Sequence, residues 1–235
     1  MYSGKRVLIT GTSRGVGESL AKHFVYNNAK VIGLCRDVEG YDCGEHFILC
    51  DLSDTESIVQ AFGKVSKFGP VDICINNAAV LTSQYALKMD VEDASRMVQI
   101  DLLAPFIVAR EAAKLIYSKS GDYGRIINIS SMAVALEPMG DSMYAACKAG
   151  LNKMSNIMAK EFAGFGITVN TLAISAIETD MLKQLNREKV DKVVKSLPIP
   201  RYATMDDITN VIDFFCSPKS DYITAQTIYL GGVHA

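Results

Sequence analysis

Residues 6–17 read Arg6-Val7-Leu8-Ile9-Thr10-Gly11-Thr12-Ser13-Arg14-Gly15-Val16-Gly17, an apolar run that leads into a glycine-rich turn. The apolar run predicts a buried strand, and residues 18–27 after the turn predict a helix. Strand, glycine turn and helix in this order place a helix N-terminus and bare backbone amides against a phosphate. The glycine spacing is G-x-x-x-G-x-G, which differs from the G-x-G-x-x-G fingerprint, so the turn alone also fits an ordinary helix start.

The same rhythm of strand and helix continues along the chain. Further strands are predicted at residues 30–35, 47–50, 71–75, 125–130, 167–173 and 227–230. Helices are predicted at residues 55–68, 91–117, 144–165 and 206–217, with the second interrupted only by Pro105. Strands that alternate with helices predict an α/β fold, with one doubly wound parallel sheet of about seven strands covered by helices on both faces. We expect residues 1–235 to form a single domain.

Composition excludes several classes of function. Of 235 residues, 49% are hydrophobic and 21% charged, as in an ordinary soluble domain, and the net charge of −2 gives no electrostatic footprint for nucleic acid. No apolar run reaches membrane-spanning length and no signal peptide is evident, so we expect a cytoplasmic protein with no membrane partner. The cysteines contain no Cys-x-x-Cys pair and predict reduced core residues, with no metal site or disulfide framework. They are Cys35, Cys43, Cys50, Cys74, Cys147 and Cys216.

Three residues in the second half of the chain predict proton-transfer chemistry. Tyr144 and Lys148 are four residues apart, so a helix presents both on one face. An ammonium beside a phenol favours the phenolate, so we expect a lowered pKa for Tyr144 and proton exchange with a carbonyl or alcohol near neutral pH. Ser131 follows the predicted strand at residues 125–130, where its hydroxyl can bond the same oxygen. Taken alone, such a Tyr and Lys are also typical of a surface pair.

Two arginines bear on the choice of nucleotide. Arg36 follows the strand at residues 30–35, where an acidic residue would hold the 2′-hydroxyl of a ribose and an arginine suits a 2′-phosphate. Arg14, within the glycine turn, supplies a second cation. Either arginine alone is commonly a solvated loop charge, but the two together favour NADP(H) over NAD(H).

Taken together, these motifs resemble those of the short-chain dehydrogenase/reductase family, in its acyl-carrier-protein reductase-like branch, over nearly the whole chain. The resemblance implies a Rossmann-like, NAD(P)-binding catalytic domain. It implies the catalytic residues Ser131, Tyr144 and Lys148. The implied cofactor-binding residues are Gly11, Thr12, Ser13, Arg14, Gly15, Val16 and Gly17 in the turn, Arg36, Asp51 and Leu52 near the adenine, Asn77 and Ala78 in an Asn-Asn-Ala-Gly-like segment, Tyr144, Lys148, and Ile177 and Thr179 at the nicotinamide carboxamide.

The implied function is hydride transfer between a nicotinamide and a small carbonyl or alcohol substrate. Tyr144 would supply or remove the proton, Lys148 would lower the pKa of Tyr144 and hold the nicotinamide ribose, and Ser131 would polarise the carbonyl. Two alternatives remain: a 3-oxoacyl-[acyl-carrier-protein] reductase, and a dinucleotide-binding protein that does not catalyse.

The sequence departs from the family pattern at three places. Asp101 stands where the family has the Asn of its catalytic tetrad; we include it among the catalytic residues and expect its charge to raise the pKa of Tyr144. Ile174-Ser175 replaces a Pro-Gly pair before the nicotinamide loop. Asp122 and Phe165 stand where carrier-protein reductases often have basic docking residues, which weakens the case for a carrier-bound substrate.

Two expectations concern larger features of the molecule. Residues 181–197 are polar and helix-prone, and their position after a strand makes them either a candidate lid or a surface helical hairpin. The long helices at residues 91–117 and 144–165 carry more apolar and small residues than one sheet face needs, so we expect a homodimer or homotetramer.

Overall fold

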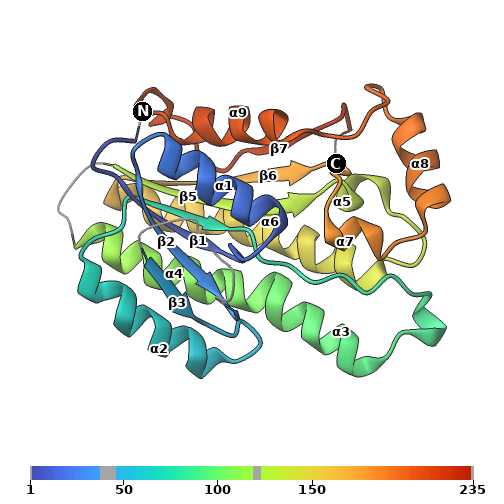
Figure 1. Ribbon diagram of the computed structural model, residues 1–235, viewed down its shortest axis with the longest axis horizontal. Helices are drawn as coiled ribbons and strands as arrows, with labels where there is room; N and C mark the ends of the chain where they lie inside the picture. Colours follow the sequence, from blue (N-terminus) through green and yellow to red (C-terminus); the bar gives the residue numbers. More distant parts are fainter. Residues whose placement is uncertain (1, 38–45, 119–122, 234–235) are drawn as a thin grey trace.

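Seven parallel strands form the central sheet of the protein (Figure 1). The computed structural model describes residues 2–37, 46–118 and 123–233, so Cys43 and Asp122 lie outside the described residues. The strand order is β3-β2-β1-β4-β5-β6-β7, which confirms the predicted α/β fold with a doubly wound parallel sheet. The strands are β1 Arg6–Thr10, β2 Lys30–Cys35, β3 His46–Leu49, β4 Ile73–Asn76, β5 Gly124–Ser131, β6 Ile167–Ile174 and β7 Thr227–Tyr229.

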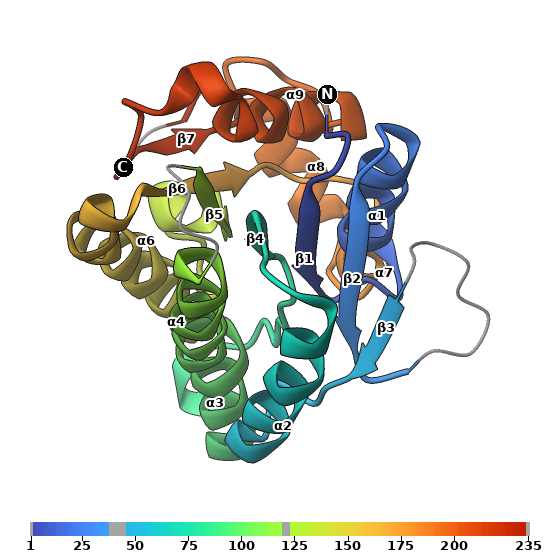
Figure 2. The ribbon, with the colours of Figure 1, turned by 90° about the vertical axis from the view of Figure 1, so that its left-hand side faces the viewer.

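Helices cover both faces of the sheet (Figure 2). One face packs against α2 Thr55–Val65, α4 Ala104–Tyr117 and α6 Ser142–Phe162, and the other against α1 Gly15–Tyr26 and α9 Met205–Cys216. Short 3-10 turns extend three of these regions, at Ser66–Phe68, Ala163–Phe165 and Pro218–Ser220, and another lies at Ala86–Lys88. Strands buried on both faces need the continuous apolar runs that the sequence shows.

The long helix predicted at residues 91–117 is three segments. The chain forms α3 Val91–Val98, then a π-helical turn at Gln99–Leu103, then α4. Pro105 has no N–H and cannot donate to the carbonyl of Asp101 four residues earlier, so the α-helical ladder is broken there. The interruption therefore begins before the proline, and it places Asp101 inside the π turn.

The segment at residues 181–197 is also divided. It forms α7 Asp180–Lys183 and α8 Arg187–Ser196, which lie beyond the carboxyl ends of the strands (Figure 1). The side chain of Asn186 accepts from Lys189 N at 3.1 Å and starts α8 as a separate helix. A four-residue α5, Ala133–Leu136, lies between β5 and α6.

Helix α1 begins at Gly15, three residues before the predicted start, so it includes the last two glycines of the turn. Gly17 leaves no room for a side chain, since an added Cβ would lie 2.1 Å from Gly11 O and 2.4 Å from Asn77 Nδ2. Gly63 of α2 is the contrasting case, because a Cβ there meets nothing within 4 Å.

We predict opposite stability effects for alanine at these two helical glycines. Gly17→Ala should lower the free energy of unfolding by about 1–3 kcal/mol through overpacking, and Gly63→Ala should raise it by about 0.5–1 kcal/mol through helix propensity. Urea unfolding followed by circular dichroism measures both. Equal effects of the two substitutions would contradict the tight packing of Gly17 against Gly11 and Asn77.

Candidate active site

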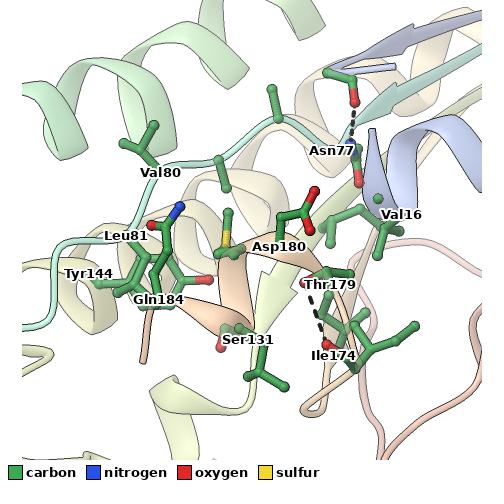
Figure 3. A pocket seen from close by; sticks show the side chains of 18 of the residues that line it. Val16, Asn77, Val80, Leu81, Ser131, Tyr144, Ile174, Thr179, Asp180 and Gln184 are labelled. Carbon is green, nitrogen blue, oxygen red and sulfur yellow. Dashed lines mark hydrogen bonds between the residues drawn. The ribbon is translucent and has the colours of Figure 1, made fainter. Parts of the chain in front are cut away.

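A cavity of about 790 Å³ lies along the carboxyl ends of the strands (Figure 3). The strand order reverses between β1 and β4, which is the position where ligands bind in open parallel sheets. Most of the residues predicted from the sequence line this one cavity: Gly11, Ser13, Arg14, Gly15, Val16, Arg36, Asp51, Leu52, Asn77, Ala78, Ser131, Tyr144, Lys148, Ile177 and Thr179. The structure does not place Thr12, Gly17 or Asp101 on its wall.

The glycine turn is fixed to the end of β4 by four hydrogen bonds. Asn77 Nδ2 donates to Thr10 O at 3.0 Å and to Gly11 O at 3.3 Å. In return, Thr10 Oγ1 accepts from the backbone N–H groups of Asn77 and Ala78, each at 3.0 Å. The predicted cofactor residue Asn77 therefore holds the turn in shape. Thr12 is buried behind the turn, where a Cβ on Gly33 would come within 2.4 Å of Thr12 Oγ1.

The residues at this end of the cavity fit a nicotinamide dinucleotide. Gly15 has φ +61° and begins α1, so its turn presents unshielded backbone at a helix N-terminus, the arrangement that binds phosphate. Arg14 and Arg36 are exposed and line the cavity. The carboxylate of Asp51 accepts from Ser53 N at 2.9 Å and Ser53 Oγ at 2.7 Å, and these hydrogen bonds lower the pKa of Asp51.

Tyr144 and Lys148 lie one turn apart on α6 and both are buried, with 9% and 2% of their surfaces exposed. Lys148 Nζ lies 5.7 Å from the centre of the Tyr144 ring and donates to Ile129 O at 3.2 Å. Ser131, at the end of β5, lies beside Tyr144 on the cavity wall (Figure 3). Its Oγ accepts from Ala133 N at 3.1 Å, which fixes the hydroxyl at this end of the strand.

The expectation of a lowered pKa for Tyr144 is wrong in direction. Burial raises the pKa of Tyr144, and this effect outweighs the opposing influence of the Lys148 charge. The negative charge of Asp101 raises the pKa further, while a hydrogen bond with Ser131 lowers it. Sequence spacing identifies the neighbouring ammonium but not the desolvation of the phenol, which is the larger effect.

Asp101 faces Lys148 from the π turn. Its side chain is fully buried, its Oδ1 lies 3.5 Å from Lys148 Nζ, and the same oxygen accepts from Val80 N at 3.2 Å. Its Oδ2 is buried and has no hydrogen-bond partner among the described residues. Burial raises the pKa of Asp101 and the Lys148 charge opposes that shift. Asp101 therefore lies behind the cavity wall, where it pairs with Lys148 and its charge acts on the Tyr144 phenol.

The loop that the sequence predicts to hold the nicotinamide begins with Ile174-Ser175 in place of a Pro-Gly pair. Met132 N donates to Ile174 O at 2.9 Å, so the end of β6 is held against the segment that follows β5. Ile177 pairs with Ala203 in an isolated parallel bridge, and Thr179 Oγ1 donates to Ile177 O at 3.4 Å. These contacts give the loop a defined path along the cavity without the proline.

The mouth of the cavity is lined by residues that the sequence did not assign to the site, and by residues 181–197, which the sequence indicated as a candidate lid. Many are apolar: Leu81, Met132, Leu136, Met139, Leu182, Leu185, Val190 and Val193. The last four belong to the region of α7 and α8, so this segment forms a wall of the cavity, and the apolar positions within 181–197 were the available signal. Asp141 also lines this part. Cys147, which the sequence places beside the site, is buried, and burial raises the pKa of its thiol.

Comparison with known proteins agrees with this fold and cavity. The family described as Enoyl-(Acyl carrier protein) reductase matches residues 11–234. The 3-oxoacyl-[acyl-carrier-protein] reductase FabG of Rickettsia bellii is 35% identical over 98% of this chain and 96% of its own length, and that of Escherichia coli is 31% identical over 98% and 97%. A crystal structure of a putative gluconate dehydrogenase from Agrobacterium tumefaciens superimposes with a TM-score of 0.89 at 28% identity, covering 98% of this chain and 95% of that one.

The chain belongs to the short-chain dehydrogenase/reductase family, in its FabG-like branch. It is an NAD(P)-dependent oxidoreductase acting on CH–OH groups, as the sequence predicted. Among the described residues, no group of three or more His, Cys, Asp or Glu could hold a metal ion. Within the same ranges, no helix is both long enough and apolar enough to cross a bilayer.

Proposed function

We propose that this protein interconverts a ketone or aldehyde and an alcohol with NADP(H), and that residues 1–235 act as one catalytic domain. The observation that carries the proposal is the buried Tyr144, with Lys148 one turn behind it and Ser131 beside it on the cavity wall. A non-catalytic dinucleotide-binding protein has no need to bury a lysine and an aspartate behind a phenol. Burying such charges costs several kcal/mol.

The proposed mechanism assigns one task to each side chain. A bound nicotinamide supplies or accepts the hydride at the carbonyl carbon. Tyr144 donates its phenolic proton to the carbonyl oxygen in reduction and removes the alcohol proton in oxidation. Ser131 donates a hydrogen bond to the same oxygen, which stabilises the negative charge that develops there. Lys148, held by Ile129 O and Asp101, favours the phenolate after the proton has left.

The cavity wall bears on the body of the substrate. Apolar side chains such as Leu136, Met139, Leu185 and Val190 line the cavity together with the polar Gln184, which suits a ketone with a largely hydrocarbon body and a few polar groups. A 3-oxoacyl thioester is the second candidate, because the FabG relatives reduce that class according to their names. Against a carrier-bound form, Phe165 occupies an expected basic docking position and packs on Tyr117, with ring centres 5.1 Å apart.

We predict that Tyr144→Phe abolishes most turnover. Turnover is measured with a panel of test substrates: ketones, aldehydes, alcohols, and 3-oxoacyl thioesters with and without a carrier protein. Cofactor oxidation is followed by absorbance. Loss of general acid catalysis should lower kcat about 10²- to 10⁴-fold. Tyr26→Phe, on an exposed tyrosine of α1, is the matched control and should retain full activity. Equal activity of the wild type and Tyr144→Phe would contradict the proposed mechanism.

The proposed preference for NADP(H) rests on Arg14 and Arg36. Both line the same end of the cavity, and both are exposed there. A 2′-phosphate between two guanidinium groups gains charge-assisted hydrogen bonds that a 2′-hydroxyl does not make. Asp51 lies nearby, and the charge of Arg36 contributes to lowering its pKa.

We predict that Arg36→Ala weakens NADPH binding about 10- to 100-fold, the loss expected for a hydrogen bond to a charged group. Binding of NADH should change little. Titration of both nucleotides by fluorescence measures the two Kd values. Arg110→Ala is the control, because Arg110 pairs with Glu111 on the outer surface of α4. NADH binding as tightly as NADPH to the wild type would refute the preference.

We predict that Asp101→Asn shifts the pH profile. Tyr144 faces the charges of Lys148, Asp101 and Asp141, and the aspartates raise its pKa. Removing the Asp101 charge should lower that pKa, so the rise of alcohol oxidation with pH should move to lower pH with activity retained. Turnover at saturating cofactor is measured against pH, with the exposed Asp221→Asn as control. An unchanged profile would remove Asp101 from the proposed catalytic group.

We also propose a homodimer or homotetramer in the cytoplasm. Half-exposed apolar side chains on the π turn, α4 and α6 support the assembly, among them Leu103, Phe106 and Ile157. The five described cysteines are free and buried, as a reducing compartment permits.

A further inference from the structure

Lys189 is a cation in the cavity that the proposed mechanism does not use. It lies in the first turn of α8, beyond the carboxyl ends of the strands, and it lines the cavity together with the next residue, Val190 (Figure 1). Asn186 Oδ1 accepts from Lys189 N at 3.1 Å, which fixes the backbone at the start of the helix. Lys189 Nζ lies 5.8 Å from the centre of the Tyr85 ring, so the side chain extends from α8 toward the segment after β4.

Lys189 forms no ion pair in the part of the chain that the structure describes. Lys148, the other lysine on the cavity wall, pairs with Asp101, with Nζ and Oδ1 3.5 Å apart. The acidic residues around α7 and α8 pair with other cations: Asp180 with Lys183 at 2.8 Å, and Glu178 and Asp191 with Arg187 at 2.9 and 3.2 Å. The ammonium of Lys189 is therefore left at the cavity wall without a negative partner.

The position of Lys189 within α8 also favours an anion beside it. The N-terminal end of a helix carries a partial positive charge, so a lysine in the first turn is unfavourable for the helix itself. Lys195, in the last turn of α8, stands where a cation is favourable. An anionic group beside Lys189 would be attracted by the ammonium and by the helix dipole together, whereas a neutral group gains neither attraction.

Two features of the cavity keep such an anion away from the reacting carbonyl. Asp141 lines the cavity and its charge acts on the Tyr144 phenol, so an anion close to the carbonyl would be repelled. Leu185 and Val190 line the same wall as Lys189 and are apolar. A substrate with its carbonyl at Tyr144 can therefore place a hydrocarbon segment on this wall and its anionic group at Lys189.

We propose that Lys189 is a specificity-determining residue that binds an anionic oxygen group, a carboxylate or a phosphate, at the end of the substrate away from the reacting carbonyl. The substrate class is an oxo acid or an oxoalkyl phosphate, or the corresponding hydroxy compound in the oxidation direction. This inference rests on the proposed function, because it places the carbonyl at Tyr144 and Ser131. The anionic group is bound and is not consumed, so the hydride and proton balance of the reaction is unchanged.

The test compares methyl ketones with and without a negative charge. Carboxylates of increasing chain length, from 4-oxopentanoate to 8-oxononanoate, are each assayed against their methyl esters, and 6-oxoheptyl phosphate is assayed against 7-hydroxyheptan-2-one. The wild type should prefer the anion of the best pair about 3- to 10-fold in kcat/KM, between the values for an exposed ion pair and for a hydrogen bond to a charged group. The two sets distinguish a carboxylate from a phosphate, and no preference in either set would overturn the inference.

Substitutions on α8 test whether the preference comes from Lys189. Lys189→Met removes the charge and should reduce the preference to about one, through KM more than kcat, whereas Lys189→Arg should retain it. Lys192→Met is the matched control, because Lys192 is exposed on the same helix and does not line the cavity. The wild-type preference should also fall as sodium chloride is raised, since salt screens the charge. A preference that Lys189→Met leaves unchanged would refute the assignment.

Three further measurements separate recognition of the substrate from folding, catalysis and cofactor binding. Lys189→Met breaks no ion pair among the described residues, so its Tm should stay close to that of the wild type. Binding of each pair of ketones to the enzyme with oxidised NADP, where no reduction occurs, gives Kd values without turnover. A preference that Lys189→Met abolishes supports the inference even where reduction fails, and no preference overturns it even where reduction succeeds. NADPH should bind equally to both proteins, and weaker binding to Lys189→Met without a change in preference would place Lys189 at the cofactor instead.

Discussion

The ion pair between Lys148 and Asp101 is the interaction on which the rest of the site depends. Both side chains are buried, with Nζ and Oδ1 3.5 Å apart. Removing one partner of such a pair costs about 3–5 kcal/mol, because the other is left charged and buried. The pair ties α6, which carries Tyr144, to the π turn before Pro105, and Val80 N completes the link to the segment after β4.

The two ends of the cavity recognise their ligands by different parts of the chain, the backbone at one end and side chains at the other. At the nucleotide end, the backbone conformation determines what binds, because the glycine turn must lack side chains and is held in shape by Asn77 and Thr10. At the substrate end, the side chains determine which molecule fits, since apolar and polar residues from the region of α7 and α8 form one wall of the cavity. The nucleotide end therefore suits a single chemical type of cofactor, whereas the side chains at the substrate end differ between enzymes that act on different substrates. This division explains why family membership identifies the cofactor class more sharply than the substrate.

Sequence reasoning predicted the sheet and most of the cavity, because both follow from local patterns. Apolar runs locate strands, and strand ends locate residues such as Ser131 and Asn77 at one edge. Sequence reasoning missed the direction of the Tyr144 pKa shift, because the phenol is desolvated by many residues that lie far from it in the sequence. It also missed the early start of the helix interruption, since Pro105 acts on a carbonyl four residues upstream. Lys189 escaped notice because nothing in the sequence distinguishes it from the other lysines of the same helix.

The strand order has a consequence for synthesis of the chain on the ribosome. β1 lies between β2 and β4, and its pairing with β4 joins Val7 to Ile73 across all the intervening elements. One edge of β1, a strand with the apolar centre Val7-Leu8-Ile9, therefore stays unpaired until β4 has left the exit tunnel. Exposed strand edges of this kind promote aggregation of nascent chains. Slower translation before β4 would lengthen that exposure, so codon choice over residues 50–72 should affect the yield of soluble protein.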